Sequence, residues 1–165
     1  LPKILDQFTE VLWAESPVLD RFKFTLGCDD IARVWGADGQ GRAWAGAPDI
    51  IAVVNNKLTL ADLKTSVRPY SRKWPKDYEK GTKEWRNLLG GYMKFKKTCK
   101  QLAAYDIAIE QTLGMKVQQA AVLVSTPERT QLFKISRGFL NSLRQDWYKI
   151  VEEYYKQIEE CYSES

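Results

Sequence analysis

The chain contains no histidine. This absence excludes nucleophilic catalysis by Ser–His or Cys–His pairs, and it excludes metal sites that need imidazole ligands. Any chemistry performed by this protein must therefore use carboxylates, lysine, tyrosine or backbone groups.

Cysteine is scarce, and its three positions, Cys28, Cys99 and Cys161, lie far apart. No C-x-x-C pair occurs, so a zinc ribbon is not expected. An odd number of widely spaced thiols is typical of a protein in a reducing, intracellular compartment.

Long apolar runs are also missing. No stretch approaches the length of a membrane span and no secretory signal pattern opens the chain, so we expect no membrane partner. The first residue is leucine, which indicates a processed or trimmed product. The expected location is the cytoplasm, or an organelle if an upstream targeting segment is missing. A length of 165 residues with 44% hydrophobic content predicts one domain, residues 1–165, and the lack of a dimerisation signature favours a monomer.

Positive charge is concentrated in less than a quarter of the chain. Residues 64–100 hold 12 Lys and Arg against 3 Asp and Glu, a net charge of +9, whereas the remainder holds 13 against 18, a net charge of −5. Such a segment is typical of polyanion binding.

The stretch from Gly46 to Ser66 predicts a β-hairpin. Two apolar runs flank Asn55-Asn56, and asparagine tolerates the positive φ that a tight two-residue turn requires. With this turn, Val54 pairs with Lys57, and counting outward places Asp49 opposite Asp62. Lys64 projects to the same face as Asp62 because side chains alternate along a strand.

Two opposed carboxylates on a half-buried sheet repel one another and need a cation. Lys64 alone could be that cation, in which case the cluster only closes the end of the sheet. The functional alternative is a divalent metal site, because hard carboxylate oxygens suit Mg²⁺ or Mn²⁺.

Three sequence motifs occur in order: Gly46-Ala47-Pro48-Asp49, Asp62-Leu63-Lys64-Thr65-Ser66 and Gln101-Leu102-Ala103-Ala104-Tyr105. Together they resemble the GxxD, DxKTS and QxxxY motifs of the RecB-like branch of the PD-(D/E)XK nucleases. The chain is most similar to exonucleases of the mitochondrial genome maintenance type, from about Trp13 to the final helix, which includes residues 147–154. The resemblance implies an α/β fold with a restriction-endonuclease-like core, in which helices flank a central mixed β-sheet.

The resemblance also implies roles for individual residues. Asp49, Asp62 and the Leu63 backbone carbonyl would hold one or two Mg²⁺ or Mn²⁺ ions, and Lys64 would orient or deprotonate the attacking water. Glu15, in Glu15-Ser16-Pro17-Val18, matches a further catalytic and metal-binding carboxylate; a solvated strand end is the alternative. Gln101 would lie near the metal site. Some relatives carry an iron–sulfur cluster on four cysteines, and three scattered cysteines argue against one here.

The resemblance places Tyr105 near the substrate backbone, and the hydroxyls of Thr65 and Ser66 could bind phosphate or cap a turn. The basic stretch, about residues 67–100, interleaves cations with aromatic side chains, the parts of a single-strand binding groove. The residues predicted to contact DNA are Arg68, Tyr70, Arg72, Lys73 and Trp74. The alternative is a solvated charged loop whose aromatic side chains pack on the core.

Local patterns predict the remaining elements. Helices are expected over residues 1–11, 95–114 and from a Ser136 cap to about Cys161; strands are expected over residues 22–26, 31–35, 118–125 and 131–135. The predicted function is metal-dependent hydrolysis of DNA by an exonuclease acting on single strands or free ends. The alternatives are a structure-specific endonuclease of the same fold and an inactive nucleic-acid-binding module.

Overall fold

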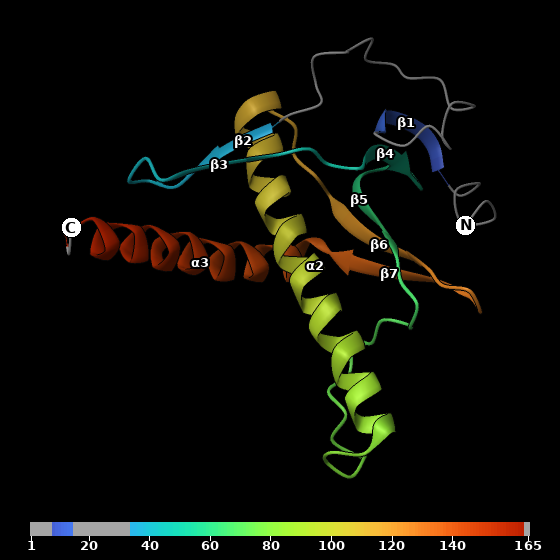
Figure 1. Ribbon diagram of the computed structural model, residues 1–165. Helices are drawn as coiled ribbons and strands as arrows, with labels where there is room; N and C mark the ends of the chain where they lie inside the picture. Colours follow the sequence, from blue (N-terminus) through green and yellow to red (C-terminus); the bar gives the residue numbers. More distant parts are fainter. Residues whose placement is uncertain (1–7, 15–33, 164–165) are drawn as a thin grey trace.

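The structure is a computed structural model that describes residues 8–14 and 34–163. Figure 1 shows the arrangement of its strands and helices. In chain order they are β1 (Phe8–Ala14), β2 (Val34–Ala37), β3 (Ala43–Gly46), β4 (Ile50–Val54), β5 (Lys57–Thr65), α2 (Lys83–Leu113), β6 (Gln119–Ser125), β7 (Thr130–Ser136) and α3 (Arg137–Ser163).

Five strands form one mixed sheet in the order β1-β4-β5-β6-β7. Strands β5 and β6 are parallel, and the other neighbouring pairs are antiparallel. A parallel pair needs a long crossover connection, which the segment containing α2 provides. The predicted α/β class, with a mixed sheet and flanking helices, is confirmed.

The β4–β5 hairpin has the predicted register. Val54 pairs with Lys57, and the pairing runs back to Ile50 opposite Ala61. Asn55 and Asn56 have φ values of 50° and 58°, the left-handed geometry that the two-residue turn requires. The pairing stops at Ile50, one residue short of Asp49, so Asp49 lies just beyond the end of the β4–β5 ladder.

The core divides between the two faces of the sheet. Ile51 and Leu60 belong to a large cluster that also contains Leu102 of α2 and Leu140 of α3, so both helices pack on this face. A smaller cluster on the other face contains Ile50, Ala52, Val54, Ala61, Ala121 and Leu123. Residues on β5 at even positions therefore face the helices.

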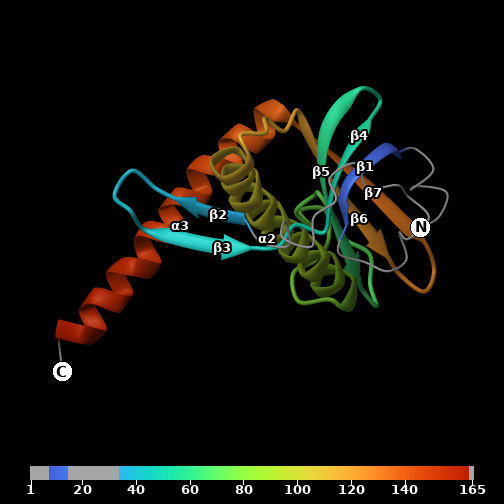
Figure 2. The same cartoon turned by 90° about the horizontal axis from the view of Figure 1, so that it is seen from above.

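Strands β2 and β3 form a separate two-stranded sheet that lies against α2 and α3 (Figure 2). The backbone of Trp35 exchanges hydrogen bonds with the Thr112 hydroxyl at the end of α2. The Tyr155 hydroxyl of α3 bonds to both the N–H and the carbonyl of Ala43. The two strands pair antiparallel, with Val34 opposite Gly46 and Ala37 opposite Ala43.

Helix α2 is longer than predicted. The prediction that this helix begins at Phe95 is wrong, because it begins at Lys83, where Thr82 caps it by accepting a hydrogen bond from the Trp85 N–H. The basic stretch of residues 67–100 is therefore a loop followed by a helix. The C-terminal end agrees with the prediction: Gly114 has φ 65° and its N–H donates to the Glu110 carbonyl.

The start of the chain also differs. Residues 8–11, predicted as helix, belong to β1, which pairs with β4 (Phe8 with Val54, Val11 with Ala52). Sheet pairing therefore overrides the apolar spacing that predicted a helix. The strand predicted at residues 22–26 lies outside the described residues, and of the strand predicted at 31–35 only the part from Val34 can be compared.

The C-terminal elements follow the prediction closely. Strands β6 and β7 flank a turn in which Thr126 and Arg129 exchange hydrogen bonds. The Ser136 hydroxyl accepts a hydrogen bond from the Phe139 N–H at the start of α3. Neither Cys99 nor Cys161 forms a disulfide. Of the helices that the structure describes, none has the length and apolar character needed to cross a membrane.

Candidate active site

Asp62 and Lys64 form an ion pair on the face of β5 that looks toward α2. Lys64 Nζ lies 3.0 Å from Asp62 Oδ1 and 2.8 Å from Oδ2. Asp62 is 1% exposed. Burial raises the pKa of Asp62 to about 6; the hydrogen bond and charge of Lys64 oppose this shift, and the neighbouring Asp49 adds to it.

Asp49 joins this pair from the end of the hairpin. Its Oδ2 accepts a hydrogen bond of 2.7 Å from the Leu63 N–H. This N–H lies beyond the last β4–β5 pair, where the ladder provides no partner, so the carboxylate replaces the missing backbone acceptor. The bond fixes Asp49 beside the Asp62-Leu63-Lys64 segment.

Gln101 and Tyr105 approach the same place from α2. The two side chains are one helical turn apart, and the Gln101 amide donates to the Tyr105 hydroxyl at 2.8 Å. The Tyr105 ring lies against Gly46, where a Cβ atom would be 2.3 Å from Cε1 of the ring. The three motifs identified in the sequence therefore meet at one site.

Charges at this site influence one another. Burial opposes protonation of Lys64, but the hydrogen bond to Asp62 and the charges of Asp62 and Asp49 raise its pKa, so Lys64 is a cation at neutral pH. Burial raises the pKa of Tyr105, with a further contribution from both carboxylates. Tyr105 is thus a neutral hydrogen-bonding group at the same pH.

The carboxylates have the chemistry of a Mg²⁺ or Mn²⁺ site. Although Lys64 Nζ is close to both oxygens of Asp62, only Oδ1 has hydrogen-bond geometry; Oδ2 is buried without a hydrogen bond. A buried carboxylate oxygen without a hydrogen bond fits a cation ligand, and Mg²⁺ is usually held by one or two carboxylates. Within residues 34–163, no third acidic or cysteine side chain completes a ligand cluster. Glu15, predicted as a further ligand, lies outside the described residues.

A cavity of about 780 Å³ opens next to Lys64. Five predicted site residues line this one space: Lys64, Thr65, Tyr70, Gln101 and Tyr105. The other residues that matter for its chemistry are Trp44, Lys94, Lys97, Lys100 and Trp147. Motif reasoning missed Trp44 and Trp147, because they come from β3 and α3 and only the fold brings them to α2.

The remaining predicted DNA contacts divide into two groups. Lys73 and Trp74 are exposed on the loop before α2, and the ring of Trp74 meets Tyr92 edge-on. Arg68 is also exposed and donates to the Asn87 side chain, while Ser66 accepts a hydrogen bond from Lys94. Contact of these residues with DNA stays a prediction.

Tyr70 and Arg72 instead have roles within the fold. The backbone of Tyr70 exchanges hydrogen bonds with the Gln131 side chain, and its own side chain is buried. The Arg72 guanidinium lies over the rings of Phe95 and Phe133 and donates to the Lys134 carbonyl. These contacts support the alternative of a loop packed on the core at these two positions.

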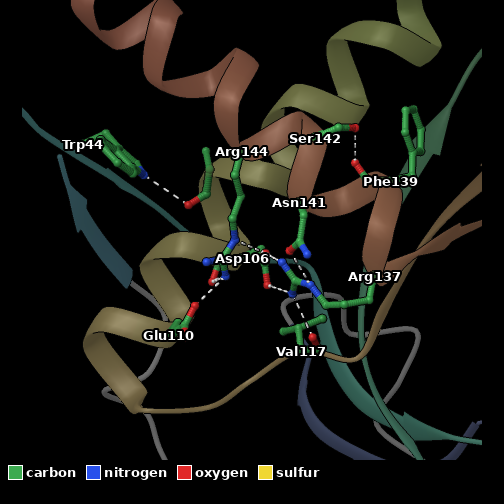
Figure 3. A network of polar contacts seen from close by, with 10 residues as sticks. Trp44, Asp106, Glu110, Val117, Arg137, Phe139, Asn141, Ser142 and Arg144 are labelled. Carbon is green, nitrogen blue, oxygen red and sulfur yellow. Dashed lines mark hydrogen bonds and ion pairs between the residues drawn. The ribbon is translucent and has the colours of Figure 1, made fainter.

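A second cavity, of about 760 Å³, lies at the opposite end of β5, next to Lys57, Arg137 and Arg144. Figure 3 shows the ion-pair network beside it. Asp106 of α2 is fully buried and is paired with Arg137 and Arg144 of α3, each at 2.6 Å. Since the network joins two helices and each charge has a partner, its evident role is to hold α2 against α3.

Comparisons with known proteins do not identify a family. No protein-family model matches the chain, and no curated protein matches it. Thirteen chains of solved structures match. Among them is one described as "Crystal structure of SSO0001", which shares 18% identity over 66% of this chain and 41% of its own length, with a TM-score of 0.31. This chain thus spans less than half of that protein, and the likeness defines neither its fold nor its activity.

Proposed function

We propose that this protein is a metal-dependent nuclease of the PD-(D/E)XK type that hydrolyses phosphodiester bonds in DNA. The observation that carries the proposal is the meeting of Asp49, Asp62 and Lys64 at one end of the β4–β5 hairpin. Asp62 keeps a buried oxygen without a hydrogen bond there. Two neighbouring carboxylates would supply the one or two acidic ligands by which Mg²⁺ is usually held.

The residues divide the chemistry between them. Asp49 and Asp62 would hold Mg²⁺ or Mn²⁺, which supplies a Lewis acid and a water of lowered pKa. Lys64, as a cation, would orient the attacking water and stabilise negative charge on the phosphate. Gln101 would hold Tyr105 toward the same space through their hydrogen bond.

The positive field favours a nucleic acid as substrate. Lys94, Lys97 and Lys100 line the cavity that contains Lys64, so phosphates entering it meet cations on the way to the carboxylates. The resemblance to RecB-like exonucleases favours DNA, with single strands or free ends as the point of attack.

The test is digestion of end-labelled linear single-stranded DNA beside the circular form, with Mg²⁺, Mn²⁺ or EDTA. We expect loss of the linear strand only, and only with metal. Lys64→Ala should lower the rate at least about 100-fold. Lys57→Ala is the matched control, because Lys57 is an exposed lysine at the other end of the same strand.

Other results would change the assignment. Cutting of the circle would identify an endonuclease of the same fold. No cutting by the wild type, together with salt-sensitive binding of the strand, would identify a nucleic-acid-binding module.

A further inference from the structure

We propose that the cavity beside Lys64 is a subsite that takes an unpaired base, together with its phosphate, from a single strand of nucleic acid. The inference rests on the proposed function and deepens it, since it assigns the nucleotide next to the reacting phosphate to residues outside the three motifs. We call Trp44, Tyr105 and Trp147 the aromatic wall, and Lys94, Lys97 and Lys100 the lysine row.

The size and lining of the cavity suit a nucleotide. Its volume of about 780 Å³ lies within the range of roughly 300–1,000 Å³ that ligand pockets occupy. The lysine row occupies one face of α2, because its members are spaced three residues apart. Four lysines but no aspartate or glutamate are among the described residues that line the cavity, so the lining itself attracts phosphate.

The aromatic wall is held in place by the fold. The Trp44 indole donates to the Ala104 carbonyl at 3.1 Å, and its ring lies edge-on to Trp147 at 5.8 Å between centroids. Gly36 lies against the same ring, where a Cβ atom would be 2.3 Å from it. A rigid aromatic surface loses little entropy on contact with a base, and each of the four bases has a π-face to offer.

The wall also contains a polar group without a partner. The indole N–H of Trp147 is buried and has no acceptor among the described residues. Such groups are rare in folded proteins. A base whose ring nitrogen or carbonyl reached this N–H would supply the missing acceptor.

Lys64 connects this cavity to the carboxylates. It lines the cavity and at the same time pairs with Asp62. A base seated in the cavity must have left its stack, because a paired base inside a duplex cannot present its face to the aromatic wall. The subsite thus selects single strands because it accepts only an unpaired, unstacked base, whichever of the four bases it is.

The test compares two oligomers in the presence of EDTA, so that cleavage does not interfere. One is a short labelled oligothymidylate, and the other has the same length and phosphates but only abasic nucleotides. Fluorescence anisotropy should show that the wild type binds the base-containing oligomer about tenfold more tightly. Trp44→Leu should reduce this preference to within about twofold and leave the affinity for the abasic oligomer unchanged.

Matched variants separate the two parts of the subsite. Trp35→Leu alters an exposed tryptophan on the neighbouring strand, outside the cavity, and should keep the preference. Lys97→Gln should lower the affinity for both oligomers by the same factor. Lys96→Gln changes a lysine on the same helix outside the cavity lining, so it should lower the affinity less. If Trp44→Leu does not fold, Tyr105→Leu tests the same wall from α2.

Equal affinity of the wild type for the two oligomers would overturn the inference, as would a full base preference in both Trp44→Leu and Tyr105→Leu. Neither result bears on cleavage, which is tested separately by digestion of the linear and circular substrates. Conversely, a base preference that Trp44→Leu removes would support the subsite even if the protein cut no DNA.

Discussion

Gly46 and Tyr105 are in direct contact, so close that a Cβ atom on Gly46 would lie 2.3 Å from Cε1 of the tyrosine ring. Gly46 comes three residues before Asp49, and Tyr105 is held by Gln101. The contact therefore fixes the distance between the hairpin that carries the carboxylates and the helix that covers them.

Gly46→Ala should disturb this contact. Overpacking at a tight site costs about 1–3 kcal/mol of unfolding free energy. A small misplacement of Tyr105 and the hairpin should also lower the rate of the proposed nuclease reaction by about 10- to 100-fold. Urea unfolding and single-turnover cleavage measure the two effects.

Two variants control this prediction. Gly39→Ala, where no atom lies within 4 Å of the new Cβ, should change stability by less than about 0.5 kcal/mol. In a Tyr105→Ala background the ring is gone, so Gly46→Ala should cost less than it does alone. Equal costs in both backgrounds would show that the ring is not what requires glycine.

The raised pKa of Asp62 predicts a pH-dependent stability. Because burial raises this pKa from its ordinary value of 3.8 to about 6, the folded state binds the proton more tightly than the unfolded chain. The contribution of this proton to the free energy of unfolding is complete below pH 4 and is lost as the pH rises through 6. The pKa difference between the folded and unfolded states corresponds to about 3 kcal/mol of this free energy. Urea unfolding between pH 4 and pH 7.5 in EDTA should show this decline in the wild type.

Asp62→Asn should remove this part of the pH dependence, whereas Asp77→Asn, on the exposed loop before α2, should keep it. The same slope in the wild type and in Asp62→Asn would contradict the assignment of the raised pKa to Asp62.

Mg²⁺ should stabilise the folded state at high pH, where the proton on Asp62 no longer does. If Asp62 is a ligand, Mg²⁺ binds its ionised form, so Mg²⁺ should raise the free energy of unfolding at pH 7.5 and have no such effect near pH 5. Thermal unfolding with Mg²⁺ and with EDTA measures the difference. Asp62→Asn should show none at either pH. An equal effect of Mg²⁺ on the variant would place the ion elsewhere.

The buried ion pairs of Asp106 predict a loss of stability without a direct effect on the site. Asp106→Asn leaves Arg137 and Arg144 without their shared carboxylate, and breaking a buried pair in this way costs about 3–5 kcal/mol. Glu110→Gln is the matched control. Glu110 pairs with the same Arg144 at 2.7 Å but is 35% exposed, so its loss should cost no more than about 1 kcal/mol. A loss of similar size in both variants, measured by urea unfolding, would contradict the network's role.

The hairpin and the positions of its charges could be predicted from the sequence because the signals are local. Asn55-Asn56 specifies the turn, and alternation then fixes which face each residue occupies. The aromatic wall could not be predicted, since Trp44 and Trp147 are about 100 residues apart and meet only through α2 and α3. Positive charge alone was likewise insufficient to predict a DNA contact at Arg72. Its guanidinium already packs on two phenylalanine rings and donates to a backbone carbonyl.

The misplaced start of α2 has its own physical cause and leads to the last prediction. Gly90-Gly91 indicates a break in a helix when only neighbouring residues are considered. In the fold, a Cβ atom on Gly91 would lie 2.6 Å from the Pro69 carbonyl oxygen, so this glycine lets the helix pass close to the loop that follows β5. Gly90 has no atom within 4 Å of its Cβ position. The two glycines therefore stand in the same helix for different reasons.

Alanine at the two positions should have opposite effects. Gly90→Ala should stabilise the protein by about 0.5–1 kcal/mol, because alanine is the better helix former and nothing obstructs it. Gly91→Ala should destabilise it by about 1–3 kcal/mol, because a backbone carbonyl cannot yield as a side chain can. Urea unfolding of both variants decides the matter. Stabilisation by both substitutions would mean that the loop does not approach α2 at Gly91, and the cavity wall at Tyr70 would then lose its support.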